Sequence, residues 1–173
     1  MKNLSNKRFV SIFSALIITI IFIAGCQQQT DYSKELKSLV DKYNSVWETG
    51  NVDELDAIFD PNFVRHADAS TSAEGLDALK KMIKDFHTAY SDKKLVSEEE
   101  IYTKDKFVGR WTFTATNTGP GEMAPTGKTI KIWGINIIHF ENGKIVEEWD
   151  GYDNQTFMEQ LGFTMVSPSG SGE

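Results

Sequence analysis

The chain has few of the residues that most often bind metals or form covalent intermediates. Its 173 residues include three histidines and a single cysteine, Cys26. The histidines lie on separate predicted elements, and no His-Glu-x-x-His or His-x-His motif occurs, so no metal site is expected. If Cys26 is lipidated, no other thiol remains, which excludes disulfides, zinc–thiolate sites and cysteine nucleophiles.

Positive charge and phosphate-binding loops are also scarce. There are 18 Lys and Arg against 25 Asp and Glu, a formal net charge of −7. Such an acidic domain is a poor binder of nucleic acids, because contacts to phosphates need clustered Lys and Arg. Gly119 and Gly121 follow no G-x-G-x-x-G spacing. We therefore expect neither a nucleic-acid partner nor a cofactor.

The first 25 residues have the layout of a cleavable export signal. Lys2, Lys7 and Arg8 form a positive region, and residues 9–23 are an apolar run that is short for a stable spanning helix. Removing residues 1–25 removes these three basic residues and no acidic one. The remaining chain has 15 Lys and Arg against 25 Asp and Glu, a formal net charge of −10.

Residues 23–26, Ile-Ala-Gly-Cys, resemble a bacterial lipobox. The resemblance implies cleavage before Cys26 and diacylglycerol on its sulfur, so that residues 1–25 are a lipoprotein signal peptide and residues 26–30 a polar tether. The alternative is an uncleaved N-terminal anchor with an incidental cysteine. In both cases the domain is expected in the cell envelope, outside the cytoplasmic membrane and held to a lipid bilayer.

Helices are predicted in the first half of the domain. Apolar residues recur at helical spacing over residues 31–49 and again over residues 73–90. Asn51 can cap a short helix between them, and Thr71 or Ser72 can cap the later one. The residues expected to pack onto the sheet, near Trp111, are Val40, Tyr43, Trp47, Leu55, Phe59, Leu79, Ile83 and Phe86.

Strands are predicted in the second half. They are expected at residues 63–67, 95–102, 107–116, 130–140 and 145–153, with a helical turn at residues 157–161. Helices followed by a meander of strands indicate an α+β domain, with helices on one face of a strongly bent antiparallel sheet and a pocket between them. The predicted domain covers residues 31–166, followed by a flexible tail at residues 167–173.

A hairpin near the C-terminus carries the candidate site. Asn142 and Gly143 predict a type I′ turn, because that turn needs positive φ at both central residues. A two-residue loop without a bulge places Asp150 opposite Ile135. Asp153 then lies on the other face of its strand. The residues expected to line the pocket are Trp47, Trp111, Trp133, Asn136, Trp149 and Tyr152.

Five segments, taken in order, resemble the SnoaL-like polyketide cyclase and ester cyclase group of the nuclear transport factor 2-like superfamily. They are residues 47–53, 60–66, 125–128, 143–150 and 160–162. The resemblance covers nearly all of residues 31–162. It implies a cone-shaped fold in which three N-terminal helices pack on the bent sheet.

The family resemblance also implies a chemistry. In that family a pocket aspartate on the last strands acts as general acid/base, moving a proton at the carbon α to a carbonyl during an aldol-type ring closure. Asp150 and Asp153 both match it, and Asp150 is preferred because Asp153 could instead cap the tail helix. Both could also be rim carboxylates. His66 matches a family histidine, and could polarise a carbonyl or be a hydrogen-bonded wall residue.

Two functions from different classes remain open. The first is a cyclase, isomerase or hydrolase that acts on a small apolar carbonyl compound without a cofactor. Proton abstraction would need a carboxylate with a pKa raised by an apolar surround, which residues beside Asp150 such as Ile135, Trp133 and Tyr152 could supply. The second is a non-catalytic lipoprotein that binds a hydrophobic small molecule.

The other face of the sheet would stay partly apolar, so a homodimer through the sheets is expected.

Overall fold

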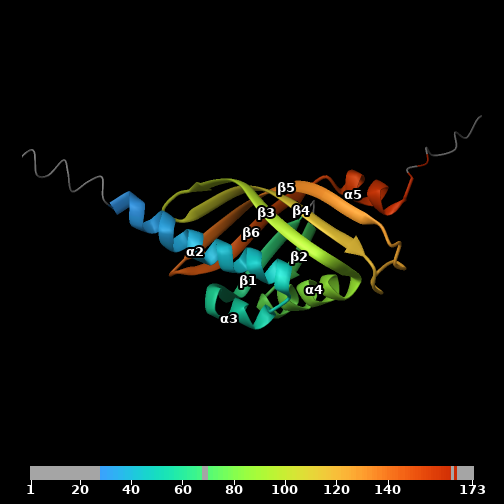
Figure 1. Ribbon diagram of the computed structural model, residues 1–173. Helices are drawn as coiled ribbons and strands as arrows, with labels where there is room; N and C mark the ends of the chain where they lie inside the picture. Colours follow the sequence, from blue (N-terminus) through green and yellow to red (C-terminus); the bar gives the residue numbers. More distant parts are fainter. Residues whose placement is uncertain (1–27, 68–69, 165, 167–173) are drawn as a thin grey trace, which may run out of the picture.

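A curved sheet with helices on one side forms the body of the protein (Figure 1). The computed structural model describes residues 28–67, 70–164 and 166. In these residues the strand order of the sheet is β2-β1-β6-β5-β4-β3. The strands are β1 (Phe59–Ala67), β2 (Ser70–Glu74), β3 (Tyr90–Tyr102), β4 (Lys106–Asn117), β5 (Thr129–Glu141) and β6 (Lys144–Tyr152).

The predicted α+β class is confirmed, with one difference in the sheet. β1 runs parallel to β6, whereas the other neighbouring strands are antiparallel. The sheet is therefore mixed rather than wholly antiparallel. The reason is topological: parallel neighbours need a long connection, and here all the elements between β1 and β6 supply it.

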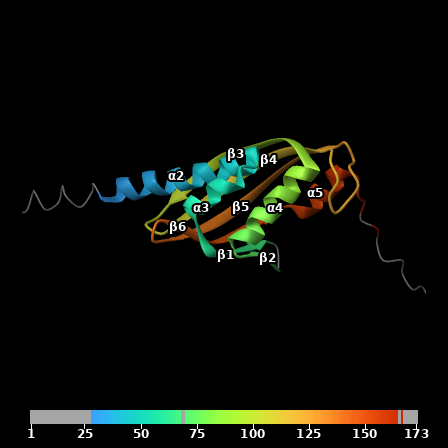
Figure 2. The ribbon, with the colours of Figure 1, turned by 90° about the horizontal axis from the view of Figure 1, so that it is seen from below.

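The helices lie where the sequence predicts helices, with changed ends. They are α2 (Gln28–Thr49), the 3-10 turn η1 (Val52–Glu54), α3 (Leu55–Ile58), α4 (Leu76–Ala89) and α5 (Asn154–Leu161). α2 takes in part of the segment expected to be a tether. Viewed from below, α2, α3 and α4 lie on one side of the sheet (Figure 2).

One predicted helix cap is wrong, and the other is right in position only, because Asn51 is the N-cap residue of η1. The segment expected to start the later helix forms β2 instead and pairs with β1, so α4 begins at Leu76 after Gly75, and neither Thr71 nor Ser72 caps it. The Asn51 amide donates to the Glu54 carboxylate rather than capping a backbone N–H. A strand pairing outweighed the local capping signal in the first case.

The predicted core is confirmed. The members that are buried are Val40, Tyr43, Leu55, Phe59, Leu79 and Ile83, while Trp47 and Phe86 are partly buried and pack against the core. The Phe59 ring makes edge contacts with the rings of Tyr43 and Phe63, at centroid distances of 4.9 and 4.7 Å. A helix stripe and a sheet face thus meet as the periodicity predicts.

A bulge changes the register of the β5–β6 hairpin. Asn142 and Gly143 have φ of 50° and 74°, as the type I′ turn requires. Beyond the turn the register shifts by one residue, so that Val146 is extra and Asp150 lies opposite Asn136 rather than Ile135. The predicted register is therefore wrong past the first pair. The shift turns Glu148 and Asp150 toward the helices, because side chains alternate along a strand.

No helix in the described part of the chain is both long and apolar enough to cross a membrane. The predicted signal peptide, Cys26 and the predicted tail at residues 167–173 lie outside that part.

Candidate functional site

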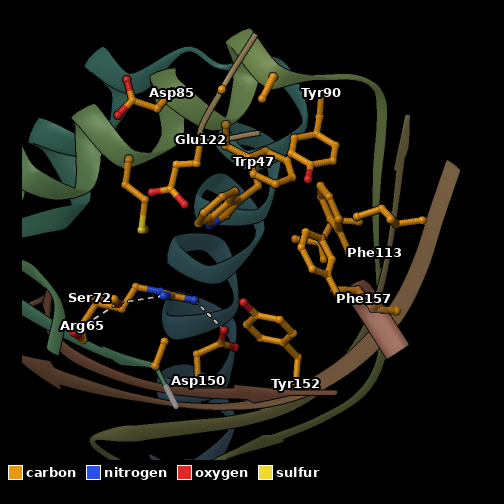
Figure 3. Close-up of a pocket in the computed structure, with 18 of the residues that line it drawn as sticks. Trp47, Arg65, Ser72, Asp85, Tyr90, Phe113, Glu122, Asp150, Tyr152 and Phe157 are labelled. Atoms are coloured by element: carbon orange, nitrogen blue, oxygen red, sulfur yellow. Dashed lines mark hydrogen bonds and ion pairs between the residues drawn. The ribbon is translucent and has the colours of Figure 1, made fainter. Parts of the chain in front are cut away.

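A cavity of about 1070 Å³ lies between the helices and the inner face of the sheet (Figure 3). Its walls come from α2, α4, α5, the sheet and the loop between β4 and β5. Aromatic side chains form much of the lining: Tyr43, Trp47, Phe86, Tyr90, Trp111, Phe113, Tyr152 and Phe157. A cavity of this size with mostly apolar walls and a few polar groups is typical of a small-molecule site.

The aromatic rings contact one another in series around the cavity. Phe86 on α4 stacks on Tyr90 at a centroid distance of 4.4 Å and meets Trp47 of α2 edge-on at 5.9 Å. Tyr152 of β6 joins this series through Phe157 of α5, at 6.2 Å. These contacts join rings from the helices and the sheet into one apolar wall.

Arg65 forms the polar floor of the cavity. β1 alternates, so Phe63 and Arg65 face inward while His66 faces outward. The Arg65 guanidinium donates to Asp150, to Glu148 at 3.2 Å and to the Ser72 hydroxyl at 2.9 Å. Only 8% of Arg65 is exposed, and although burial opposes its charge, the carboxylates of Glu148 and Asp150 raise the pKa of Arg65 above its ordinary value.

Glu148 fixes the position of Arg65. Its carboxylate accepts hydrogen bonds from the Tyr43 hydroxyl at 2.7 Å and the Asn136 amide at 3.0 Å as well as from Arg65. Burial, and then the charge of Glu148, raise the pKa of the Tyr43 phenol well above its usual range. With three donors and 3% exposure, Glu148 is a positioning residue.

Asp150 lies in the cavity, but not in the setting that the sequence suggested. Its side chain is buried, lines the cavity and pairs with Arg65. The predicted neighbours Ile135 and Trp133 lie on the opposite face and are exposed. The charged neighbour of Asp150 is thus the Arg65 guanidinium, in place of the apolar surround that the sequence suggested. In Figure 3 the Tyr152 hydroxyl points toward this pair.

Asp153 is the N-cap of α5. Its carboxylate accepts hydrogen bonds from the Thr156 backbone N–H at 3.0 Å and the Thr156 hydroxyl at 2.6 Å. These bonds lower the pKa of Asp153, and the side chain does not line the cavity. The capping alternative is the one that the geometry supports.

His66 lies on the outer face of the sheet and does not approach the cavity. Its ring stacks on Trp149 at a centroid distance of 4.0 Å, and its Nε2 lies 3.2 Å from the Glu147 carboxylate. Glu147 also pairs with His139 at 2.7 Å. Pairing His66 with Asp150 in one site is therefore wrong, because His66 follows Arg65 and alternate residues point to opposite faces.

The predicted pocket lining is right in part. Trp47, Trp111, Asn136 and Tyr152 line the cavity. Trp133 and Trp149 do not, and 55% and 49% of their surfaces are exposed. For Trp149 the cause is the bulge in β6, which reverses the faces of the residues that follow it.

Sequence reasoning missed Arg65 and Glu148 as site residues. Arg65 could have been found, because it lies two residues after Phe63 in a strand and so shares its buried face. Glu148 gave no such signal, since its inward direction depends on the bulge. Among the described residues no group of three or more His, Cys, Asp or Glu is placed to hold a metal ion.

Comparison with known proteins places this chain in a family. The family model for SnoaL-like polyketide cyclases matches residues 37–161. A search of curated proteins gave no match. Among solved structures, TsrD from Streptomyces laurentii is 22% identical with a TM-score of 0.67, covering 75% of this chain and 96% of its own.

Two other solved structures show the same fold. A SnoaL-like polyketide cyclase from Agrobacterium tumefaciens is 20% identical, with a TM-score of 0.61, and the match covers 73% of this chain and 98% of that one. An LEH-like epoxide hydrolase from M. tuberculosis is 11% identical with a TM-score of 0.61, covering 74% and 90%. The fold thus occurs with more than one activity. By its family match, the chain belongs to the SnoaL-like polyketide cyclase family.

Proposed function

We propose that the cavity carries out acid/base chemistry on a small apolar carbonyl compound, without a cofactor, and that Asp150 is the general base and acid. The observation that supports this is the carboxylate of Asp150, which lines an otherwise largely aromatic cavity beside the Arg65 guanidinium. Asp150 would take a proton from the carbon α to the carbonyl and leave an enolate. The enolate carbon then attacks a second carbonyl in a cyclisation, or is reprotonated elsewhere in an isomerisation; hydrolysis of the same substrate class is a third outcome.

Arg65 sets the strength of the proposed base. Its guanidinium pairs with Asp150, and a neighbouring positive charge favours the ionised form of a carboxyl group. The same ion pair makes Asp150 a weaker base than an unpaired buried carboxylate. The substrate should therefore have an acidic carbon, such as one between two carbonyl groups.

Deuterium exchange at the α-carbon tests this proposal without knowledge of the natural substrate. Apolar β-keto esters and ketones would be incubated with the protein in D₂O, and the exchange rate above buffer followed by NMR. We expect Asp150→Asn to lower the protein-dependent rate about 100-fold or more, because general-base catalysis contributes at least that factor. Asp153→Asn is the matched control and should keep most of the rate. An equal rate in Asp150→Asn would overturn the assignment.

A second function is non-catalytic binding of a hydrophobic small molecule. It is favoured by the hydrogen bonding of the polar floor, where every buried group has a partner. In the described residues no buried side-chain N or O lacks one. A network that is satisfied internally can be purely structural. In that case no tested compound would exchange at a rate that depends on Asp150, and Asp150→Asn would keep its affinity for apolar ligands.

We further propose that the protein is a lipoprotein of the cell envelope, anchored through Cys26. The first turns of α2 extend away from the sheet, which would hold the cavity off the bilayer (Figure 1). Cys26→Ser should leave the precursor unprocessed and without a lipid label. Two or more acyl chains are enough for stable attachment, so the wild-type protein should sediment with membranes. A mature, unlipidated N-terminus in the wild-type protein would contradict the proposal.

A further inference from the structure

The cavity offers no uncommitted positive charge to a ligand. Its ionisable lining consists of two cations, Arg65 and Lys81, and four carboxylates, Asp85, Glu122, Glu148 and Asp150. Arg65 pairs with two of the carboxylates, and the exposed Lys81 pairs with Asp85. With all six ionised the formal balance of the lining is −2. A carboxylate, sulfate or phosphate on a ligand would therefore find no free cation among the described lining residues.

Glu122 is the acidic residue that the polar network does not use. It lies on the loop between β4 and β5, and its side chain points into the cavity (Figure 3). Within the described residues its carboxylate makes no hydrogen bond or ion pair. It is close to Tyr90: burial first, and then Tyr152 and Glu122, raise the pKa of the Tyr90 phenol. A negative charge thus faces the aromatic wall.

The loop that carries Glu122 is fastened to the end of α4. The backbone N–H of Gly119 and the Asn117 amide both donate to the Ala89 carbonyl, at 3.0 and 3.2 Å. A Cβ on Gly119 would lie 1.9 Å from the Thr88 carbonyl oxygen, so only glycine allows this approach. On the far side of the loop, the Asn117 side chain accepts from the Thr126 N–H at 2.7 Å. Both ends of the loop that carries the exposed Glu122 are therefore fastened.

An aromatic wall beside a carboxylate suits a cation. The faces of Trp, Tyr and Phe rings attract ammonium groups, most strongly when water is excluded. Trp47, Phe86 and Tyr90 form a contiguous part of the wall on the helix side of the cavity. The acidic surface of the whole chain, with a net charge of −7, would also attract cations over a longer range.

We propose that the cavity selects an apolar molecule that carries an ammonium group, with the cation between Glu122 and the aromatic wall and the carbonyl end toward Asp150. The position of the carbonyl end rests on the proposed function, whereas the preference for a cation can be measured without turnover. Anionic ligands of the same size are excluded because the Arg65 guanidinium already pairs with Glu148 and Asp150.

Three ligands with the same decyl chain test the preference. Decyltrimethylammonium, 1-decanol and decyl sulfate, each below its critical micelle concentration, would be titrated while tryptophan fluorescence is followed in the Trp133→Thr/Trp149→Thr variant, whose two remaining tryptophans, Trp47 and Trp111, line the cavity. We expect the ammonium compound to bind at least about tenfold more tightly than the sulfate at low salt. Because charges are screened, the difference should shrink in 0.5 M NaCl.

Charge variants of Glu122 identify the group responsible. Glu122→Gln should weaken binding of decyltrimethylammonium about fivefold and leave 1-decanol unchanged. Glu122→Lys should also strengthen binding of decyl sulfate. The matched control is Glu141→Gln, an exposed glutamate outside the cavity lining, which should alter none of the three affinities.

Two results would overturn the proposal. One is decyl sulfate binding as tightly as the ammonium compound to the protein that keeps Glu122; the other is an unchanged preference in both Glu122 variants. Because the exchange test depends on Asp150 and the binding test on Glu122, either proposal can fail while the other stands. A protein that prefers the ammonium compound but catalyses no exchange would be a binder of cationic amphiphiles.

Discussion

Each face of the sheet has an exception to the usual distribution of side chains. The inner face buries one guanidinium and two carboxylates, those of Arg65, Glu148 and Asp150. The outer face exposes the large apolar side chains Trp133, Ile135, Ile137 and Trp149, each between 38% and 55% accessible. Proteins ordinarily bury apolar groups and expose charges, so both faces depart from the usual distribution.

Ion pairs on the two faces differ in the cost of breaking them. On the inner face the paired side chains of Arg65, Glu148 and Asp150 are at most 10% exposed. On the outer face, Glu147 bridges His66 and His139, and all three are between 22% and 32% exposed. Water can replace a lost partner on the outer face but not on the inner one. Breaking a pair on the inner face should therefore cost more free energy of unfolding than breaking a pair of similar length on the outer face.

The largest expected effect is the removal of the buried cation. Arg65→Met leaves two buried carboxylates without their shared partner, which should lower the free energy of unfolding by about 3–5 kcal/mol. Chemical denaturation at pH 7 measures it. The control is Arg110→Met, whose ion pair with Glu99 is exposed; it should change the same quantity by less than about 0.5 kcal/mol. Similar losses in both variants would show that burial does not distinguish these pairs.

A smaller effect is expected on the outer face, where we propose that a second copy of the chain packs. Trp133→Thr and Trp149→Thr should raise the dissociation constant of the dimer about tenfold or more, because buried Trp side chains dominate many interfaces. Sedimentation velocity at micromolar concentration measures it. Ile101→Thr, an exposed apolar change on edge strand β3, is the control. A wild-type protein that is monomeric under these conditions would refute the dimer.

The smallest effect concerns a histidine on the helix side, away from both faces. Burial lowers the pKa of His87 on α4 below the usual histidine value of about 6.5, although its ring nitrogen lies 3.0 Å from the Trp47 carbonyl oxygen. The folded protein therefore binds this proton less readily than the unfolded chain. Stability should fall as the pH drops below about 6.5.

His87→Gln should remove part of that pH dependence. Unfolding free energies of the wild type and the variant would be compared at pH 7.5 and 5.5. Between these two values the wild type should lose more stability than the variant. In the wild type the unfolded chain binds a proton at His87 more readily than the folded protein, whereas the glutamine of the variant cannot bind one in either state. An equal loss in both proteins would assign the pH dependence to other groups.

Much of the architecture could be predicted from local patterns. Helical periodicity located α2 and α4 and the apolar residues on their inner sides, such as Val40 and Ile83. The Asn142-Gly143 pair located the hairpin turn. These features depend on residues close in the chain, whose preferences for helix, turn and burial operate before distant segments meet.

The errors come from how strands pair, including the bulge in β6 that turns Trp149 outward. β2 formed where a helix start was expected because β1 offered it a partner. His66 and Trp149 were expected in the pocket and instead stack on each other outside it, since β1 runs beside β6 only in the folded sheet. The strand propensities of single residues do not specify which strand β1 pairs with.

By itself, the sequence determined the α+β class, the helix stripes and the strands of this protein, because their signals repeat every few residues. Tertiary structure decided the polar floor of the site. One extra residue, Val146, turns Glu148 and Asp150 inward, and the parallel pairing of β1 with β6 brings Arg65 between them. Since a one-residue shift exchanges the two faces of a strand, side-chain direction at the site follows from the assembled sheet and not from the residues themselves.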